Sequence, residues 1–312
     1  MNKETTKQTS MAASPDKNDR AMKKAQKMRK AYDKLHSKKV RMRSSYILRA
    51  FLAVSALFTV AILVFLIGYI LINGIPNLKP ELFALEYTPD NVSMLPSIIN
   101  TIFITLISLI AAVPVGIFSA IYLAEYAKKG SKIVSLIRLT TETLSGIPSI
   151  VYGLFGFLCF VIALKWDYSM LAGSMTLAIM ILPLIMRTTE EALISVPDSF
   201  REASYGLGAG KLRTIFKIVL PSAVPGILAG VILAIGRIAG ESAALIYTAG
   251  TVPSIPKDLF SSTSTLSVHM YTLLSEGLHT NEAYATAVVL LVMVVGINTL
   301  SYAVAKKLTK KY

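Results

Sequence analysis

Six long stretches of apolar residues, almost free of charge, constrain the fold of this 312-residue chain more than any other feature. They cover residues 50–72, 98–124, 144–164, 169–186, 223–247 and 284–305. A membrane core of about 30 Å is crossed by about 20 residues of α-helix, so each stretch approaches the length of one span. Lipid offers the backbone no hydrogen bonds, so such spans are expected to be helical. The pattern predicts an all-α polytopic membrane protein with six transmembrane helices, and it argues against a soluble or disordered chain.

The positions of the basic residues predict how the chain is oriented. With a cytoplasmic N-terminus, 28 of the 32 Lys and Arg residues lie in cytoplasmic segments and three lie outside. Because Lys and Arg accumulate in cytoplasmic loops, both termini are expected to be cytoplasmic. The net charge of +14 therefore reflects orientation, and no nucleic-acid partner is expected. About 49 residues precede the first stretch, so we expect it to be a membrane anchor and not a cleaved signal peptide.

The composition predicts four regions along the chain. Residues 1–46 form a basic cytoplasmic tail that we expect to lack packed structure, and residues 307–312 form a short basic C-terminal tail. Between them lie the first helix with an external segment (47–94) and a core of five transmembrane helices (95–306). A second external segment, 248–283, has apolar residues at helical spacing and predicts a short amphipathic helix. Those residues are Leu266, Met270, Leu273 and Leu274.

The cytoplasmic segment 187–222 is too long to be a plain connection between two helices. Its apolar residues recur every three or four positions, which predicts two short amphipathic helices; the segment from Ser195 to Asp198 breaks the first run, and the glycines at 206, 208 and 210 break the second. Such a helix-turn-helix is either a docking surface for a partner protein or a loop packed on its own bundle. The string from Gly206 to Lys211 is not a P-loop, because Tyr205 and Leu212 occupy the positions that require Gly and Ser or Thr.

The spacing of residues in this segment resembles the signature of permease subunits in binding-protein-dependent ABC importers. The chain reads Glu202-Ala203-Ser204, then Gly208, then Ile218, Leu220 and Pro221, and every spacing matches that signature. Ser204 replaces the usual second Ala, which exchanges one small residue for another. The resemblance implies a type I ABC importer permease fold, in which this loop is the coupling helix that contacts the ATPase.

A narrower resemblance covers about residues 95–306. The strings at 120–126, 146–156, 189–193 and 237–243 resemble those of phosphate importer permeases, more closely of the A-type subunit. Ser242 stands where that family usually has Thr, which preserves the hydroxyl. The resemblance implies a permease subunit of a phosphate importer in a bacterial plasma membrane. It also implies a C-type permease partner, an ATPase dimer and an external phosphate-binding protein that docks on the external segments, with no cofactor.

The fifth stretch is the one that contains charges, Arg237 and Glu241. A lone Arg at the centre of a membrane helix costs at least about 2.5–3.5 kcal/mol. Four residues apart on one helix, the two side chains would share a face and pair. The pair is either purely structural or part of an anion path, in which Arg237 contacts phosphate and Glu241 weakens binding to help release. Arg187, at the cytoplasmic end of the fourth stretch, is either a second anion contact or a flanking charge.

No residues suggest bond chemistry within the chain. The single cysteine, Cys159, excludes an intrachain disulfide, and His269 and His279 lack a third metal ligand nearby. A catalytic Ser/His/Asp arrangement is also not evident, so a non-enzymatic transporter subunit is expected. Three alternatives remain at this stage: an importer of another solute, an ion-coupled secondary carrier and a membrane scaffold.

Overall fold

The computed structural model describes residues 20, 22–30, 38–128 and 130–309, and this part of the chain contains helices but no strand. Two compact units are present, residues 1–67 and 68–312. The first unit contains a short α-helical segment, residues 22–30, and most of α2 (Lys38–Gly74). Residues 1–19, 21, 31–37 and 310–312 lie outside the described residues, so most of the predicted N-terminal tail and half of the C-terminal tail are not addressed by the structure.

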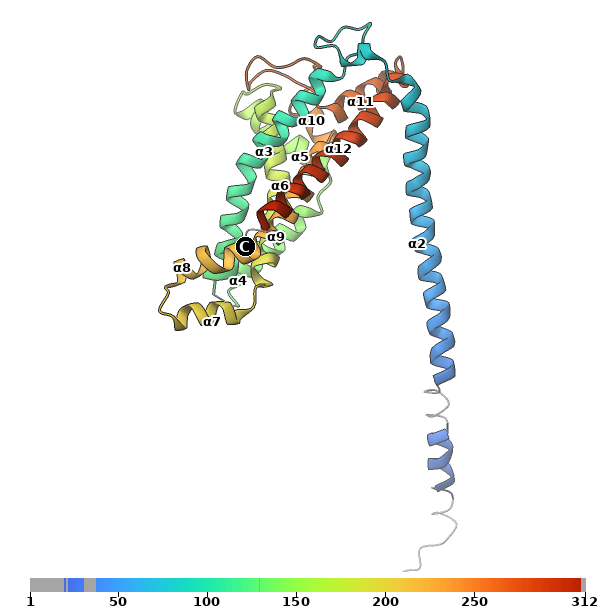
Figure 1. Cartoon of the computed structure of the whole chain (residues 1–312), viewed down its shortest axis with the longest axis vertical. Coiled ribbons are helices and arrows are strands. Elements are labelled where there is room, and N and C mark those ends of the chain that lie inside the picture. The colour runs from blue at the N-terminus through green and yellow to red at the C-terminus, as the bar shows by residue number, and fades with distance from the viewer. Residues whose placement is uncertain (1–19, 21, 31–37, 129, 310–312) are drawn as a thin grey trace, which may run out of the picture. The chain divides into compact units, whose positions relative to one another are not determined.

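The second unit is a bundle of helices with connecting turns (Figure 1). Its elements after α2 are η1 (Ile75–Asn77), η2 (Pro80–Phe83), α3 (Leu95–Ile121), η3 (Tyr122–Tyr126), α4 (Lys132–Ser145), α5 (Ser149–Gly156), η4 (Phe157–Ala163), α6 (Met170–Ile194), α7 (Asp198–Gly206), α8 (Lys211–Thr214), η5 (Ile215–Val219), α9 (Leu220–Ala239), α10 (Ala243–Ile246), α11 (Leu266–Glu276) and α12 (Thr280–Thr309). The α7–α8 end of the unit lies opposite the end that carries η2 and α11 (Figure 1).

Five helical segments of the described chain are long and apolar enough to cross a membrane. They are Leu48–Asn77, Leu95–Tyr126, Met170–Ile194, Lys211–Ala239 and Thr280–Lys307. They agree with five of the stretches predicted from sequence, and the all-α membrane fold is confirmed. The fourth predicted stretch ends at residue 186, whereas its helix continues to Ile194, so Arg187 lies within a continuous helix.

The third predicted stretch, 144–164, is not a single straight span. Two helical segments, Lys132–Ser145 and Ser149–Ala163, meet at an angle of 102°. Pro148 has an extended backbone (φ −58°, ψ 140°) and breaks the helix at this position. The second segment has eight α-helical residues followed by seven in a π-helix, and it rises only about 22 Å. A complete sixth span therefore requires both segments as one bent pair.

The fifth predicted stretch, 223–247, ends earlier than expected. Helix α9 stops at Ala239, where Gly240 closes the last turn, and the chain then forms the four-residue helix α10. Arg237 is therefore in α9, but Glu241 lies beyond its end. The prediction that these two side chains share one helix face is wrong, because the helix breaks between them.

Helix α6 is the centre of the bundle. Of its most apolar 18-residue window, 61% is buried, compared with 33% for the span that contains α3 and 28% for the span that contains α9. It packs against α3, α9, α4 and α5. Its core residues Leu177, Ile181 and Ile185 are fully buried against side chains of these helices. Helices α3, α4, α5, α9 and α10 contact α6 directly, and α11 and α12 are joined to it through α3 and α9.

Polar side chains join the outer end of α3 to the segment before α11. The Asn100 amide donates to the carbonyl oxygens of Ser254 (2.9 Å) and Ser264 (3.2 Å). The hydroxyl of Thr101 accepts a hydrogen bond from the Leu266 amide (2.9 Å). The predicted short helix near Leu266 is confirmed as α11, and this buried network fixes its start on α3.

His269 of α11 is buried in the same region. It is 3% exposed, and its ring meets the ring of Tyr87 edge-on with 6.0 Å between the ring centroids. Burial lowers the pKa of His269 from 6.5 to about 4, and a hydrogen bond with the backbone of Val92 opposes this only partly. His269 is therefore neutral near pH 7.

We expect Gly153→Ala to destabilise the bundle. A methyl group at Gly153 of α5 would lie 2.8 Å from the Ala244 Cα, and backbone atoms cannot move aside as the end of a side chain can. The expected loss is about 1–3 kcal/mol, measured as a lower melting temperature of the detergent-solubilised protein. Gly296→Ala in α12 is the matched control, since nothing lies within 4 Å of the added carbon. Equal melting temperatures for the two variants would contradict the close approach of α5 and α10.

We also expect part of the acid sensitivity of the protein to come from His269. The pKa of His269 is lower in the folded protein than in the unfolded chain, so protonation favours unfolding. The stability that neutral His269 contributes is fully present above pH 6.5 and is lost as the pH falls toward 4. Between pH 7 and pH 5 this amounts to about 2 kcal/mol. The melting temperature of His269→Gln should fall less over this interval than that of the wild type. Parallel pH profiles would show that the folded protein binds the proton as readily as the unfolded chain.

Candidate functional site

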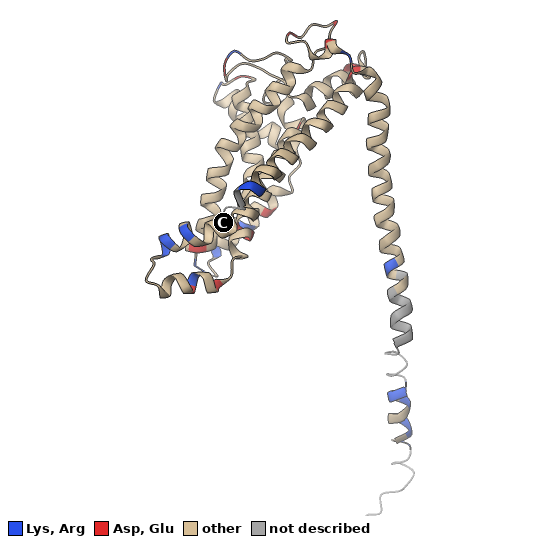
Figure 2. Ribbon diagram, viewed as in Figure 1, with Lys and Arg blue, Asp and Glu red and all other residues tan. Residues whose placement is uncertain are grey.

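Residues 198–214 form a compact helical hairpin, here called the α7–α8 hairpin. Gly208 adopts φ +81°, a left-handed conformation that favours glycine, and turns the chain after α7. The buried hydroxyl groups of Ser204 and Thr214 are 2.8 Å apart and join the two helices. The two short helices predicted within the 187–222 loop are therefore confirmed, and they form one unit. Both Lys or Arg positions and Asp or Glu positions are marked along the ribbon at this end of the second unit (Figure 2).

The apolar residues of this loop divide into an inner and an outer set. The inner set is buried against α3 and α9 and consists of Ala192, Leu193, Val196, Ile215 and Val219. The outer set, here called the exposed apolar face, consists of Phe200, Leu207, Leu212 and Phe216. Leu207 at the turn is 90% exposed. Large apolar side chains that remain exposed mark a candidate interaction surface, which favours a docking role over a loop that only packs on its own bundle.

The residues of the sequence signature have different positions in this structure. Glu202 and Ala203 are exposed on α7, and Gly208 is exposed at the turn, whereas Ser204 is buried between the helices. Ile218, Leu220 and Pro221 are half-buried where η5 passes into α9. The exposed Glu202, Ala203 and Gly208 are thus available to a partner. The half-buried residues Ile218, Leu220 and Pro221 connect the hairpin to a membrane-spanning helix.

An ion pair that the sequence did not reveal joins the hairpin to α3. Arg201 of α7 donates to Glu125 of η3 through both Nε (3.1 Å) and one terminal nitrogen (2.7 Å). The side chains of Arg201 and Glu125 are only 14% and 6% exposed. Glu125 is the first acidic residue after an uncharged stretch of the chain, which is the signal that could have drawn attention to it.

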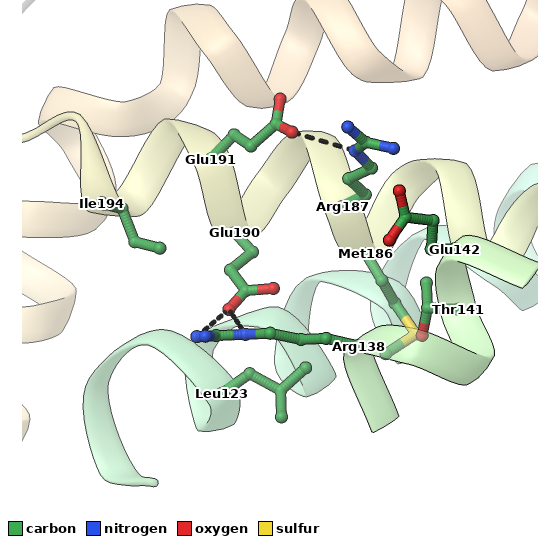
Figure 3. A pocket seen from close by; sticks show the side chains of 9 residues that line it. All are labelled: Leu123, Arg138, Thr141, Glu142, Met186, Arg187, Glu190, Glu191 and Ile194. Atoms are coloured by element: carbon green, nitrogen blue, oxygen red, sulfur yellow. Dashed lines mark hydrogen bonds and ion pairs between the residues drawn. The ribbon is translucent and has the colours of Figure 1, made fainter. Parts of the chain in front are cut away.

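A cavity of about 260 Å³ lies between α4 and α6 (Figure 3). Arg138 of α4 pairs with Glu190 of α6 at 2.6 Å and holds the two helices together. Arg187 pairs with Glu191 on the next turn of α6 at 3.0 Å, and Glu142 also lines the cavity beside Arg187. Three carboxylates therefore face two guanidinium groups, and the side chain of Arg187 is 55% exposed.

Arg237 lines a different and larger hollow, a groove of about 1000 Å³ between α6, α9 and α12. Among the described residues that line it, Arg237 carries the single charge, and the others are apolar or uncharged polar groups. On α12 these include Asn298, Thr299 and Tyr302. Gly236 of α9 faces the Asn298 amide: a methyl group there would lie in ordinary contact, 3.4 Å from its nitrogen and its oxygen.

Arg237 and Glu241, which the sequence predicted as a pair, have different surroundings. Within the described residues, no ion pair shorter than 4.0 Å joins them. The Glu241 carboxylate instead accepts a hydrogen bond from the Ala244 amide (3.1 Å) at the start of α10, and its carbonyl accepts one from the Ser267 hydroxyl. The structure therefore places Arg237 without a carboxylate contact, in a groove within the membrane-spanning helices. Arg187 and Arg237 line separate cavities.

Comparison with known proteins places the chain in a family. Residues 112–312 match the model of the family described as binding-protein-dependent transport system inner membrane component. The probable ABC transporter permease protein YqgI of Bacillus subtilis is 36% identical over 233 residues, which cover 70% of this chain and 79% of that protein. The phosphate transport system permease protein PstA of Mycobacterium leprae is 39% identical over 203 residues. The match to PstA covers 62% of this chain and 64% of PstA.

A solved structure of the MetNI methionine ABC transporter in an inward-facing conformation contains a chain with the same fold. The TM-score is 0.61 at 19% sequence identity, and the match covers 72% of this chain and all of the other. The resemblance to ABC importer permeases and the predicted fold are thus confirmed. With a family model that matches most of its length and a curated relative covered over more than two thirds, the chain belongs to the inner membrane components of binding-protein-dependent transport systems.

Proposed function

We propose that this chain is one of the two permease subunits of an ATP-driven phosphate importer and forms half of its transmembrane path. One observation carries the proposal: a guanidinium without a carboxylate contact lines a groove between membrane-spanning helices, in a chain similar to phosphate permeases. A charged side chain at membrane depth faces protein or a water-filled cavity and not lipid. The groove is open in a single copy of the chain, so we infer that a second, C-type permease covers it.

Arg237 suits a phosphate path chemically. A guanidinium matches two phosphate oxygens with two parallel hydrogen bonds, and it stays charged at every physiological pH. Asn298 and Thr299 add neutral polar groups on the facing helix. In this proposal Glu241 lies past the helix break, borders the path and weakens anion binding by repulsion. Such opposition favours passage over tight retention.

Arg187 is proposed as a second anion contact at the exit. Its present partner is the carboxylate of Glu191 on its own helix, and Glu142 lies nearby. An anion would have to displace Glu191, which is feasible because the pair is exposed and such surface pairs contribute less than about 1 kcal/mol. The excess of carboxylates in this cavity would then drive the anion onward into the cytoplasm.

The α7–α8 hairpin is proposed as the contact with the ATPase dimer. The exposed apolar face and the exposed part of the signature, Glu202, Ala203 and Gly208, form its docking surface, and Ser204, Ile218, Leu220 and Pro221 hold that surface on α9. This assignment places the hairpin and both termini in the cytoplasm of a bacterial cell. The opposite end, with residues 73–97 and 248–283, then receives phosphate from an external binding protein, and this chain itself performs no bond chemistry.

The proposal predicts that the chain co-purifies with its ATPase and partner permease, and that ATP hydrolysis rises when phosphate and the binding protein are added together. Sulfate with the same components should give no stimulation. Leu207→Glu places a charge in the exposed apolar face and should abolish co-purification with the ATPase while leaving the two permeases together. Transport without an ATPase would instead identify an ion-coupled carrier, and stimulation by another solute would identify a different importer.

A second prediction concerns Arg237. In an assembled transporter, Arg237→Ala should lower phosphate uptake about 10- to 100-fold, the range expected for loss of a charge-assisted hydrogen bond. Arg237→Lys is the matched control: it keeps the charge but cannot bind bidentately, so uptake should lie between that of Arg237→Ala and the wild type. Co-purification with the ATPase checks that each variant is assembled. Wild-type uptake by assembled Arg237→Ala would exclude a contact between Arg237 and phosphate.

A further inference from the structure

Each helix of the α7–α8 hairpin contributes one basic side chain that contacts the C-terminal end of the helix that α3 begins. Arg201 of α7 binds Glu125, and Lys211 of α8 lies over the ring of the next residue, Tyr126, with 4.7 Å between Nζ and the ring centroid. Both targets are in η3, the last turn of the helix that α3 begins. Two adjacent residues of one helix end are thus held from two sides.

The guanidinium of Arg201 also reaches the end of α6. It donates to the carbonyl oxygens of Leu193 (2.9 Å) and Val196 (2.7 Å), in addition to its bonds to Glu125 and to Asp198 (3.2 Å). The Leu193 carbonyl also accepts from the Val196 amide (3.4 Å), so Arg201 adds a charged donor at the end of α6 and a second one at the Val196 carbonyl in the turn that follows. One side chain therefore joins α7 to both α3 and α6.

Arg201 is a stronger link than an ordinary surface pair. Its side chain is 14% exposed and that of Glu125 is 6% exposed, so water screens their attraction weakly. Removing either partner leaves a largely buried charge uncompensated, which costs far more than loss of an exposed pair. This contact consequently resists the separation of α7 from α3.

Arg201 links α7 directly to the end of the helix that α3 begins. The hairpin follows α6 and precedes α9 in the chain, whereas Arg201 and Glu125 are 76 residues apart in sequence. The apolar cluster beside the hairpin joins Ala120 and Ile121 of α3 to Ile215 and Val219 of η5, and it contains no residue of α7. Arg201 is thus the ion-pair contact from α7 itself to the end of the helix that α3 begins, beside the contacts that Lys211 of α8 and the apolar residues of η5 make with the same helix.

The opposite end of α3 is attached just as firmly. There Asn100 and Thr101 bind the backbone of the segment that leads into α11. A displacement of the hairpin that moves α3 is therefore passed to the outer end of the bundle. A displacement that α3 does not follow would stay at the hairpin.

We propose that Arg201 is a positioning residue that makes the α7–α8 hairpin and α3 move as one body when the ATPase moves the hairpin. The inference rests on the proposed role of the hairpin as the ATPase contact. It adds that α3, and not only the covalently attached α6 and α9, receives the displacement. Arg201 touches neither ATPase nor solute in this account; it acts through Glu125 and the carbonyl oxygens of α6.

The test uses the complete transporter with Arg201→Ala, and Lys217→Ala on η5 as an exposed basic control. Hydrogen exchange of residues 119–126 and of the hairpin is measured with and without ATP, together with phosphate uptake. In the wild type and the control, both regions should respond to ATP. In Arg201→Ala the hairpin should still respond, residues 119–126 should not, and uptake should fall about tenfold or more, within the usual range of coupling between sites.

A merely structural role would loosen residues 119–126 equally with and without ATP and would leave their response to ATP intact. That result, or wild-type uptake, overturns the proposal. If Arg201→Ala does not assemble, Glu125→Gln keeps the size of the acceptor and removes its charge, and the same two readouts decide. The exchange measurement does not depend on which solute is carried. If the wild-type complex does not take up phosphate, the proposed function is contradicted. The hydrogen-exchange response of residues 119–126 to ATP then still decides this inference.

Discussion

The absence of hydrogen-bonding solvent in the membrane core controls this structure, because every break in a helix must be repaired by the protein itself. At the break between α4 and α5, the Tyr152 hydroxyl donates to the Leu144 carbonyl (2.8 Å). At the end of α9, the Glu241 carboxylate accepts from the Ala244 amide and its carbonyl accepts from Ser267. The irregular segments within the bundle are thus tolerated because side chains, together with backbone bonds such as that from the Ile147 amide to the Leu144 carbonyl (3.1 Å), provide partners for the backbone groups at the breaks.

The helices that contain these breaks lie around one continuous central helix, α6. Helix α6 is continuous and largely buried, and small residues let its neighbours approach: a methyl group at Gly116 of α3 would lie 2.7 Å from the Ile185 side chain, and one at Gly230 of α9 would lie 2.0 Å from the Thr188 hydroxyl. Membrane helices associate largely through such close packing, since lipid provides no hydrophobic drive between them.

The sequence pattern predicted the long helices because their signal is local: apolar composition and length decide a span. It also predicted the hairpin, since its glycines and its 3.6-residue period are local too. The pairing of Arg237 with Glu241 was wrong because composition does not show that Gly240 ends the helix between them. The pairs Arg201–Glu125 and Arg138–Glu190 were missed because they join residues 76 and 52 positions apart, which no spacing rule connects.

The corrected position of Glu241 changes the meaning of Arg237. A buried Arg–Glu pair would be electrically neutral and would offer an anion little attraction. With Glu241 engaged at the start of α10, the charge of Arg237 stays uncompensated within its groove, and a second protein surface or a bound anion has to offset it. An unpaired guanidinium raises the free energy of a membrane helix, and a bound anion would lower it again. In the proposed anion path, the helix break at Gly240 therefore matters as much as Arg237 itself.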